Sequence, residues 1–413
     1  MSPVTISPDL RSALAGCDTF AARWRSRFPI LESTTYLVTH SLGAMPRTAQ
    51  ERLMAYTQQW ATRGVRSWAE GWWDSPVVVG NLIARILNAP EGSVAMHTNV
   101  SQIEGVIASA LDFTKKRNKV VYTDQNFPTN MYAWEGWKRY GARISMVQSD
   151  PGGIVPTERL LAAIDEETLI VPISHVLFRT SRLQDAKAVC ERARAVGALV
   201  LLDTYQSLGT VPVDVKALGV DMVCGGSVKW LCGGPGAGYL YVRPDLQDKL
   251  EPLITGWAGH AAPFAFELGA QRYAPGIRRF LNGSPAVPSL VQASAGYEQV
   301  LEVGVDAIRK HSITLTETLR RTLESEGFQS GSPANPEQRG GSLTVRLQPE
   351  EHGPSYVAAL EKRGVLVDHR PEAGLRVSPH FYTSWSELEA FVAALVELRN
   401  TGKWKDAAGS KSY

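Results

Sequence analysis

ALVLLD at residues 198–203 and GGSVKWLCGGPGAGYLYV at residues 225–242 are the two stretches that decide the fold. The first is an apolar run that closes on an acid, Asp203, and the second carries a lysine, Lys229, in the loop after the apolar run 221–225. A carboxylate at the end of a buried strand is either exposed in a turn or buried with a cationic partner. A pyridine cofactor offers two matching groups, a ring nitrogen for the acid and an aldehyde for the lysine. The pair therefore predicts pyridoxal phosphate.

The neighbours of Lys229 favour a reactive amine. Trp230 and Leu231 follow it, so we expect the amine to be partly removed from water. Such burial favours the neutral amine, which is the form that reacts with an aldehyde. A lysine in a loop is more often a surface residue, and this one gains its meaning from the acid that accompanies it.

Short apolar runs alternate with helical periods over the middle of the chain. The helices have apolar faces of the amphipathic kind, for example Val100, Ile103 and Ile107. Alternation of this kind predicts an α/β fold, with a mainly parallel sheet of the seven-stranded type that helices cover on both faces. Ligands of such sheets bind at the carboxyl ends of the strands. The candidate strands are residues 93–97, 119–124, 168–174, 198–203, 221–225 and 238–243.

The pattern changes near residue 285. A long interrupted helix (290–327) and a polar loop (329–341) precede a strand, helix, strand, strand, helix succession. Its last helix begins with a capping box from Ser384 to Glu387, and the whole predicts a smaller α+β C-terminal domain. The expected divisions are an N-terminal arm (1–45) that contributes to the small domain and the active site, a large cofactor-binding domain (46–285), a small domain (286–400) and a tail (401–413).

Composition excludes several classes of function. The chain of 413 residues has 43 basic and 41 acidic residues, so no strong field indicates nucleic acid or a membrane surface, and we expect a small-molecule substrate. The start of the chain lacks a basic segment followed by an apolar run, and no stretch reaches the roughly 18 apolar residues of a membrane span. The four cysteines show no CxxC spacing, which favours the cytoplasm. The eight histidines show no metal-ligand spacing, so no metal is expected.

A phosphate group needs its own binding site, and HTNVSQ at residues 97–102 is the candidate. It lies between a predicted strand and a predicted helix, with Asn99 placed as the cap and backbone N–H groups free to face an anion. Ser227 adds a hydroxyl near the lysine, and Phe127 is placed to cover one face of the ring. A turn serine and a packing phenylalanine are the simpler interpretations of these two residues.

The glycine-rich run GGPGAG at residues 233–238 has a different explanation. It does not follow the first strand of a βαβ unit, and it leads directly into the strand GYLYV. A nicotinamide-binding loop would open a helix instead. We interpret the run as a tight backbone turn.

At this point the motifs carry a family resemblance. Asp203, Gln206, Gly209 and Lys229 resemble the class V branch of the fold type I pyridoxal phosphate enzymes, and within that branch the chain is most similar to kynureninase. The likeness extends from about residue 25 to residue 400 and depends on the order of short motifs. These are HSLGAMP (40–46), SW…GWW (67–73), NFPTNMY (126–132), FRTSRLQD (178–185), GWAGH (256–260), GIRRFLNGSP (276–285) and LRVSPHFY (375–382).

The resemblance implies roles for individual residues. Asp203 would pair with the ring nitrogen, Gln206 would contact the ring hydroxyl, and Lys229 would bind the aldehyde. Other residues implied in cofactor binding are Phe127, which stacks on the ring, and Thr98, Asn99, Val100 and Ser227 around the phosphate. Trp257 and Ser284 match positions that reach the cofactor of a neighbouring subunit, which implies a homodimer with shared active sites. The implied substrate-binding residues are Arg376, which clamps a carboxylate, and His40, Trp72 and Phe178.

Three positions depart from the kynureninase pattern. Val228 stands where a tyrosine implicated in proton transfer is usual, Gln206 stands in place of a histidine, and Asn130 in place of an aspartate. Val228 removes a candidate general acid. The departures leave the cofactor prediction intact and bear on the reaction.

The favoured reaction is hydrolysis between Cβ and Cγ of a γ-keto amino acid such as kynurenine, which gives alanine and a carboxylic acid. Transamination, a lyase reaction such as β-elimination, and other C–C bond reactions start from the same carbanion and stay open. Desulfuration is disfavoured, since no cysteine follows Cys232. A non-catalytic regulator that binds the cofactor is disfavoured because the chain has neither length nor basic charge for a DNA-binding domain.

Overall fold

The computed structural model describes residues 8–407, and its centre is a seven-stranded sheet. The strand order is β2-β8-β7-β6-β5-β3-β4. Strands from β7 to β4 run parallel to one another, and β8 is antiparallel to both of its neighbours. The predicted mainly parallel sheet is therefore confirmed. The strands are β2 Val94–His97, β3 Lys119–Thr123, β4 Arg143–Val147, β5 Thr168–Ser174, β6 Leu199–Asp203, β7 Met222–Gly226 and β8 Gly238–Val242.

One strand of this sheet, β4, was not predicted from the sequence. It lies at the edge of the sheet and pairs only with β3 among residues 8–407. Arg143 and Met146 are exposed on it, so the strand lacks the continuous apolar run of its buried neighbours. An exposed charged residue is typical of an edge strand.

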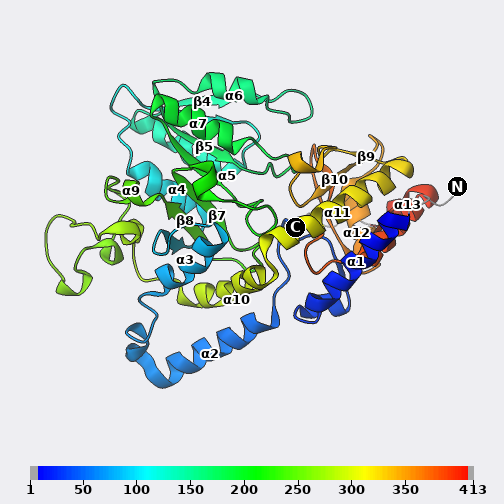
Figure 1. Ribbon diagram of the computed structural model, residues 1–413, viewed down its shortest axis with the longest axis horizontal. Coiled ribbons are helices and arrows are strands. Elements are labelled where there is room, and N and C mark those ends of the chain that lie inside the picture. Colours follow the sequence, from blue (N-terminus) through cyan, green and yellow to red (C-terminus); the bar gives the residue numbers. More distant parts are fainter. Residues whose placement is uncertain (1–7, 408–413) are drawn as a thin grey trace.

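Helices cover both faces of the sheet (Figure 1). One face packs against α3 (Ser75–Ile86), α6 (Thr157–Ala163), α7 (Ala186–Val196) and α10 (Val287–Val303). The other face packs against α4 (Val100–Ser109) and α5 (Pro128–Glu135). Side chains alternate between the two cores along each strand, which is the period of two that a strand imposes. On β6, for example, Val200 and Leu202 join the first core and Leu201 joins the second.

The C-terminal part has a separate core around an antiparallel sheet of order β12-β13-β10-β9. Leu14 and Cys17 of the N-terminal helix lie in this core. Ser384 and Glu387 form the predicted capping box at its last helix. The predicted smaller α+β unit is confirmed. Its elements are α1 Pro8–Arg25, β9 Gln329–Ser330, β10 Leu343–Arg346, α11 Val305–Ser325, α12 Gly353–Glu361, β12 Asp368–Arg370, β13 Gly374–Val377 and α13 Trp385–Thr401.

The expected long helix from residue 290 is two helices, α10 and α11, which separate at Gly304. Its φ of +83° is a conformation that favours glycine. By its contacts α10 belongs with the large unit, because it packs against α3 and against α2 (Arg47–Arg63). The proposed domain limits stay predictions, and residues 1–7 of the arm and 408–413 of the tail lie outside the described residues.

The remaining elements are short. β1 (Thr35–Tyr36) pairs in parallel with β11 (Val365–Leu366), so the N-terminal segment joins the C-terminal unit by backbone pairing as well. No helix between residues 8 and 407 is both long enough and apolar enough to cross a membrane. The other short helices are α8 Val215–Leu218, α9 Pro244–Gln247, and the 3-10 turns Pro29–Glu32, Gly64–Trp68, Gly136–Tyr140, Trp257–Gly259, Pro263–Ala265, Gly276–Phe280, Pro336–Gln338 and Lys403–Asp406.

Candidate active site

A cavity of about 220 Å³ opens at the carboxyl ends of β5, β6 and β7. It is the position where α/β sheets bind ligands. Asp203 closes β6, Ser174 closes β5, and Lys229 follows β7 by three residues. The cavity is lined by Asn99, Val100, Ser101, Phe127, Thr129, Asn130, Ser174, Val176, Phe178, Asp203, Tyr205, Gln206 and Lys229.

The amine of Lys229 lies among aromatic rings. Its Nζ is 5.6 Å from the ring centre of Phe127 and 4.4 Å from that of Tyr205. Burial, the largest effect, and the charge of Arg376 together lower the pKa of the amine to about 7, while Asp203 acts in the opposite direction. A large share of the amine is therefore neutral at neutral pH, which is the state that attacks an aldehyde.

Asp203 is buried, and it is held from its own loop and from the next strand. One carboxylate oxygen accepts the backbone N–H of Tyr205 at 2.9 Å, and the other accepts the Ser174 hydroxyl at 3.4 Å. Burial raises the pKa of the carboxyl, and the Tyr205 N–H and Lys229 oppose that rise. A cationic group in the cavity would favour the charged carboxylate.

The first turn of α4 forms part of the cavity wall. Asn99 is its N-cap, and its side-chain oxygen accepts the Gln102 N–H at 2.9 Å. The N–H groups of Val100 and Ser101 make no hydrogen bond within residues 8–407. Free N–H groups at a helix N-terminus favour an anion, as the sequence analysis predicted for this segment.

Gln206 is buried between the two units. Its amide donates to the His40 carbonyl at 3.1 Å, and its oxygen accepts the Trp230 indole N–H at 3.1 Å. These two contacts fix the orientation of the amide at the edge of the cavity. Gln206 thus connects the N-terminal segment at His40 to the loop that carries Lys229 and Trp230.

Arg376 and His40 converge on a fully buried acid, Asp368. Arg376 donates to both carboxylate oxygens, at 2.8 and 2.5 Å, and to the Phe178 carbonyl at 2.9 Å. His40 contacts Asp368 through Nε2 at 2.9 Å and Ser378 through Nδ1 at 2.6 Å. Burial tends to raise the pKa of Asp368, but His40 and Arg376 together hold it well below its usual range. Burial also lowers the pKa of His40 to about 4, so its ring is neutral at neutral pH.

Several predicted site residues do not line this cavity in their own chain. Ser227 donates to the Ala237 carbonyl at 2.6 Å and is hydrogen-bonded to Tyr297. Thr98 and Ser284 line a separate small cavity of about 60 Å³. Trp257 packs on Trp73, with 4.7 Å between ring centres. Trp72 stacks on Tyr56 at 5.0 Å, beside α2, and donates to Gln59.

The structure also adds residues that the sequence did not indicate. Tyr205 and Ser174 line the cavity, and Asp368 binds Arg376. Ser174 had a signal, since it closes a predicted strand next to that of Asp203. Asp368 had a weaker one, because Asp368 and Arg376 occur on two short runs that form opposite strands of a hairpin.

Glu104 on α4 is the most unusual of the added residues. It is fully buried, and neither carboxylate oxygen has a hydrogen-bond partner among residues 8–407. The indole of Trp134 lies close to it but makes no hydrogen bond of good geometry. Burial raises the pKa of Glu104 well above its usual value, and the charge of Asp203 raises it further. Glu104 therefore favours the protonated, neutral acid more strongly than an exposed glutamate does.

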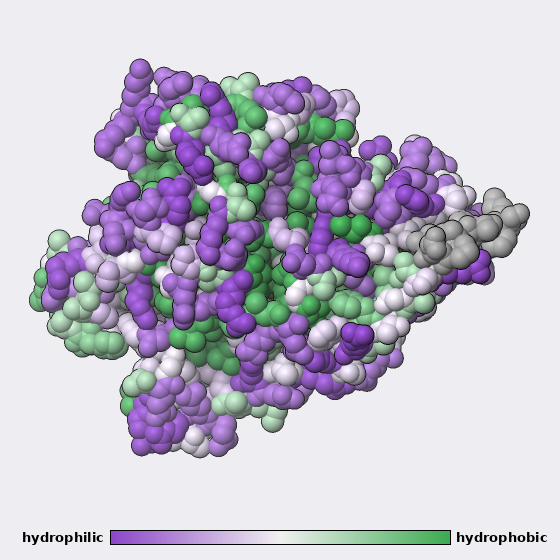
Figure 2. Space-filling model, viewed as in Figure 1, coloured by the Kyte–Doolittle hydropathy of each residue, from purple (hydrophilic) through white to green (hydrophobic). Residues whose placement is uncertain are grey.

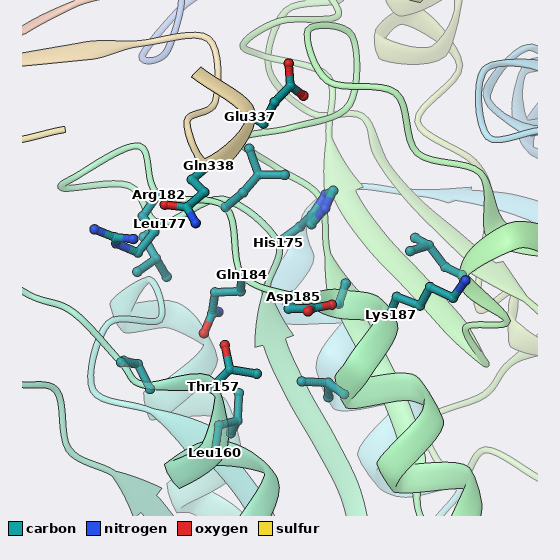
Figure 3. A pocket seen from close by; sticks show the side chains of 15 residues that line it. Thr157, Leu160, His175, Leu177, Arg182, Gln184, Asp185, Lys187, Glu337 and Gln338 are labelled. Carbon is teal, nitrogen blue, oxygen red and sulfur yellow. The ribbon is translucent and has the colours of Figure 1, made fainter. Parts of the chain in front are cut away.

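A second cavity, of about 430 Å³, lies on the other side of the segment that follows β5 (Figure 3). His175, Leu177 and Gln184 line it together with Thr157 of α6 and with Glu337 and Gln338 of the C-terminal unit. Residues along this segment alternate, because Ser174, Val176 and Phe178 line the first cavity whereas His175 and Leu177 line the second. The two cavities have no lining residue in common.

The residues of the first cavity fit pyridoxal phosphate. A buried carboxylate suits the ring nitrogen, a neutral amine suits the aldehyde, an aromatic ring suits a ring face, and unpaired N–H groups suit the phosphate. The buried Asn130 side-chain oxygen, which has no partner in the part of the chain that the structure describes, is a further polar group left for a ligand. Residues 8–407 contain no group of three or more acidic, histidine or cysteine side chains that would hold a metal.

Solved structures with a similar fold include a cysteine desulfurase and the lyase C-DES, a mutant of which was solved with a pyridoxal phosphate cofactor. A cysteine desulfurase from Thermococcus onnurineus aligns over 92% of this chain and 98% of its own, with a TM-score of 0.82 and 20% identity. The cystine C-S lyase C-DES aligns over 90% of this chain and 99% of its own, with a TM-score of 0.81 and 20% identity. At this identity the likeness shows the fold. The protein has the fold of a type I pyridoxal phosphate-dependent enzyme, as the sequence predicted.

Sequence comparisons identify the family. The family model described as aminotransferase class-V matches residues 45–396. The chain is 32% identical over 366 residues to an uncharacterized aminotransferase of Bacillus subtilis (strain 168), YcbU, which covers 89% of this chain and 95% of that protein. It is 31% identical over 401 residues to a kynureninase of Pseudomonas fluorescens, which covers 93% of each. The chain belongs to the aminotransferase class-V family of pyridoxal phosphate-dependent enzymes, and the cofactor prediction is confirmed.

Proposed function

We propose that this enzyme hydrolyses the bond between Cβ and Cγ of a γ-keto amino acid, kynurenine or an analogue, to give alanine and a carboxylic acid. The observation that carries the proposal is the similarity to kynureninases over 92 to 93% of both chains, with identities of 30 and 31%. The cavity supports it, because Lys229 and the buried Asp203 line it and Arg376, which does not line it, donates to the carbonyl of the lining residue Phe178. Val228, Gln206 and Asn130 are the positions at which the chain departs from the kynureninase pattern.

The residues that would hold the cofactor come from four segments. Lys229 would bind the aldehyde, Asp203 the ring nitrogen, and Gln206 the ring hydroxyl. Phe127 would cover one face of the ring, and the first turn of α4, with Asn99 and Val100, would bind the phosphate. Bound pyridoxal phosphate supplies a ring that accepts the electron pair left at the substrate Cα when its proton is removed.

Lys229 is proposed as the base at Cα. Its free Nζ has a pKa of about 7, so this amine would accept a proton near neutral pH. Asp203, held by the Tyr205 N–H and by Ser174, would place its carboxylate against the ring nitrogen of the bound cofactor. A carboxylate fixed in this way favours the protonated ring.

Arg376 is proposed to bind the α-carboxylate of the substrate. A guanidinium has five N–H donors, and three of them are engaged with Asp368 and the Phe178 carbonyl. Two donors remain for a substrate carboxylate. Asp368 holds the side chain in one orientation and balances its charge, so the arginine is positioned before the substrate arrives.

Transamination is the second candidate reaction. The similarity to YcbU, described as an aminotransferase, favours it, with 32% identity over 89% of this chain. Both reactions begin with loss of the Cα proton, so the same Lys229, Asp203 and Arg376 would serve either one.

The two reactions are separated by their products. Purified holoenzyme incubated with L-kynurenine is expected to release anthranilate and alanine in equal amounts, and Lys229→Ala is expected to release neither. A 2-oxo acid formed from the amino acid, without alanine, would favour transamination. Absence of all these products from a preparation that contains bound cofactor would contradict the hydrolytic proposal.

We also propose a homodimer with shared active sites. The segment from Leu253 to Leu268 presents several large apolar side chains to solvent, and it forms the loop that projects at the left of Figures 1 and 2. Leu268 is 100% exposed, and Phe264 and Phe266 are 59 and 70% exposed. An exposed apolar patch of this kind marks an interaction surface. Trp257 lies in the same segment, which agrees with the implied role of Trp257 and Ser284 at the cofactor of a second subunit.

We propose a cytoplasmic location because the cysteines form no disulfides. All four thiols, those of Cys17, Cys190, Cys224 and Cys232, are buried and unpaired. Unpaired thiols are the normal state in a reducing compartment.

A further inference from the structure

Tyr205 is the aromatic residue closest to the reactive amine. It follows Asp203 by two residues, and its backbone N–H donates to the Asp203 carboxylate at 2.9 Å. Its ring centre lies 4.4 Å from Nζ of Lys229, nearer than the 5.6 Å of Phe127. The loop geometry that places the acid therefore also places this ring.

The two rings reach the amine from different parts of the fold. Phe127 comes from the loop between β3 and α5 and is 44% exposed, so it lies at the open side of the cavity. Tyr205 comes from the loop after β6 and lies against Gly226 at the end of β7, on the sheet side. A cofactor whose aldehyde binds at Nζ would therefore have its ring between Phe127 and Tyr205.

Gly226 is the residue that makes room for the ring of Tyr205. A Cβ atom at this position would lie 2.5 Å from Cε2 and Cζ of Tyr205 and 2.6 Å from its hydroxyl. Real Cβ atoms do not approach other atoms so closely. Gly226 is not among the glycines with positive φ, so its backbone does not require glycine. The space taken by the tyrosine ring requires it.

We propose that Tyr205 stacks on the face of the pyridoxal phosphate ring opposite Phe127, and that Gly226 is the matching gap in the sheet edge that lets it lie there. The inference rests on the proposed cofactor site and concerns neither the substrate nor the reaction. Tyr205 is thus a cofactor-binding residue, and residues 205 and 226 act as one steric unit.

The energetic consequence is modest and specific. Aromatic pairs in offset or edge geometry contribute enough beyond burial to change a dissociation constant roughly twofold to tenfold. The hydroxyl of Tyr205 has no part in the stacking. Tyr205→Phe should therefore bind the cofactor as the wild-type protein does, whereas Tyr205→Ala should bind it several times more weakly.

The test is a titration of cofactor-free protein with pyridoxal phosphate, followed by the visible absorbance and the fluorescence of the bound cofactor. Tyr205→Ala is expected to raise the dissociation constant roughly twofold to tenfold and to shift the absorbance maximum, with both effects absent in Tyr205→Phe. Tyr205→Leu separates aromatic stacking from bulk and replaces the alanine variant if that variant does not fold. Wild-type affinity and absorbance in the alanine and leucine variants would overturn the inference.

The variant Gly226→Ala tests the same proposal from the glycine side. The added Cβ meets the far end of a side chain, so it is expected to displace the ring and to leave the backbone in place. Its affinity should then match that of Tyr205→Ala, and the double variant should be no weaker than either single one. Additive losses would contradict a single steric unit. If the wild-type protein itself shows no cofactor absorbance, the proposed function fails, an outcome distinct from failure of the stacking.

Discussion

Lys229 controls the capture of the cofactor through the charge on its amine. Because burial and Arg376 lower its pKa to about 7, the neutral fraction rises between about pH 6 and pH 8 and then levels off. The rate at which cofactor-free protein forms the covalent bond with pyridoxal phosphate should follow that curve. Stopped-flow absorbance measures it, with Lys229→Ala as the control. A rate that keeps rising toward pH 10, as for an ordinary lysine, would contradict the lowered pKa.

Glu104 makes the stability of the protein depend on pH. The folded protein keeps a proton on Glu104 that the unfolded chain releases above about pH 4.5, so this group stabilises the fold fully below that pH and less as the pH rises. Glu104→Gln keeps the shape and cannot ionise. The variant should melt like the wild-type protein near pH 4.5 and at a higher temperature at pH 7 to 8. The difference grows by up to about 1.4 kcal/mol per pH unit until the folded group ionises.

Thermal melting across pH measures this effect, and the exposed Glu389 offers a matched control. Glu389→Gln makes the same chemical change at a solvent-exposed site, where a substitution alters stability little. A wild-type protein that gains stability relative to Glu104→Gln as the pH rises would show that Glu104 is ionised in the folded state.

The sequence was sufficient to predict site residues where chemistry and strand ends coincide. Asp203 and Lys229 each follow an apolar run, so their meeting at one edge of the sheet follows from the parallel topology. The pairing of Arg376 with Asp368 depends on the register of a short hairpin, and the sequence does not specify that register. The place of Tyr205 depends on a missing Cβ in another strand, and that is visible only in three dimensions.

Among the elements, α4 connects stability to phosphate binding. Asn99→Ala removes its N-cap and should cost about 1 kcal/mol of unfolding free energy. It should also weaken cofactor binding, because the unpaired N–H groups of the first turn lose their fixed direction. Asp185 caps α7 in the same way and does not line the cofactor cavity. Asp185→Ala should therefore lose similar stability and keep its cofactor affinity, as measured by chemical denaturation and absorbance titration.

Equal cofactor affinities in the two cap variants would contradict a phosphate site at α4.

The elements were predicted well where periodicity is strong, as in the six buried strands. Periodicity did not reveal β4, because an exposed edge strand lacks an apolar run. It also did not place the break between α10 and α11, since one glycine with a positive φ redirects a helix whose pattern continues on both sides.

At the scale of the whole molecule, the exposed apolar segment from Leu253 to Leu268 predicts a homodimer. Leu268→Asp together with Phe266→Asp should convert a wild-type dimer to a monomer, because two charges would enter an apolar interface. Light scattering coupled to size-exclusion chromatography measures the mass. Ile154→Asp is the control, since Ile154 is an exposed apolar residue of the loop before α6. A wild-type protein that is already monomeric would contradict the proposed homodimer.

The sharing of active sites has its own readout. If Trp257 and Ser284 reach the cofactor of the other subunit, mixing Lys229→Ala with Trp257→Ala should restore activity, since some mixed dimers carry one intact site. No restoration from two inactive variants would contradict the sharing. The sequence of one chain predicts such residues only by resemblance, because the cavity that they would complete belongs to another copy.

The alternation of residues 174–178 between two cavities has a practical consequence for redesign. Residues 174–178 separate the first cavity, of about 220 Å³, from the second, of about 430 Å³. The even-numbered residues line the first cavity and the odd-numbered residues line the second. A mutant library at Val176 and Phe178 would reshape the chamber next to Lys229 and leave the other lining intact. A library at His175 and Leu177 would do the reverse. The two cavities can thus be redesigned independently, although the same backbone segment separates them.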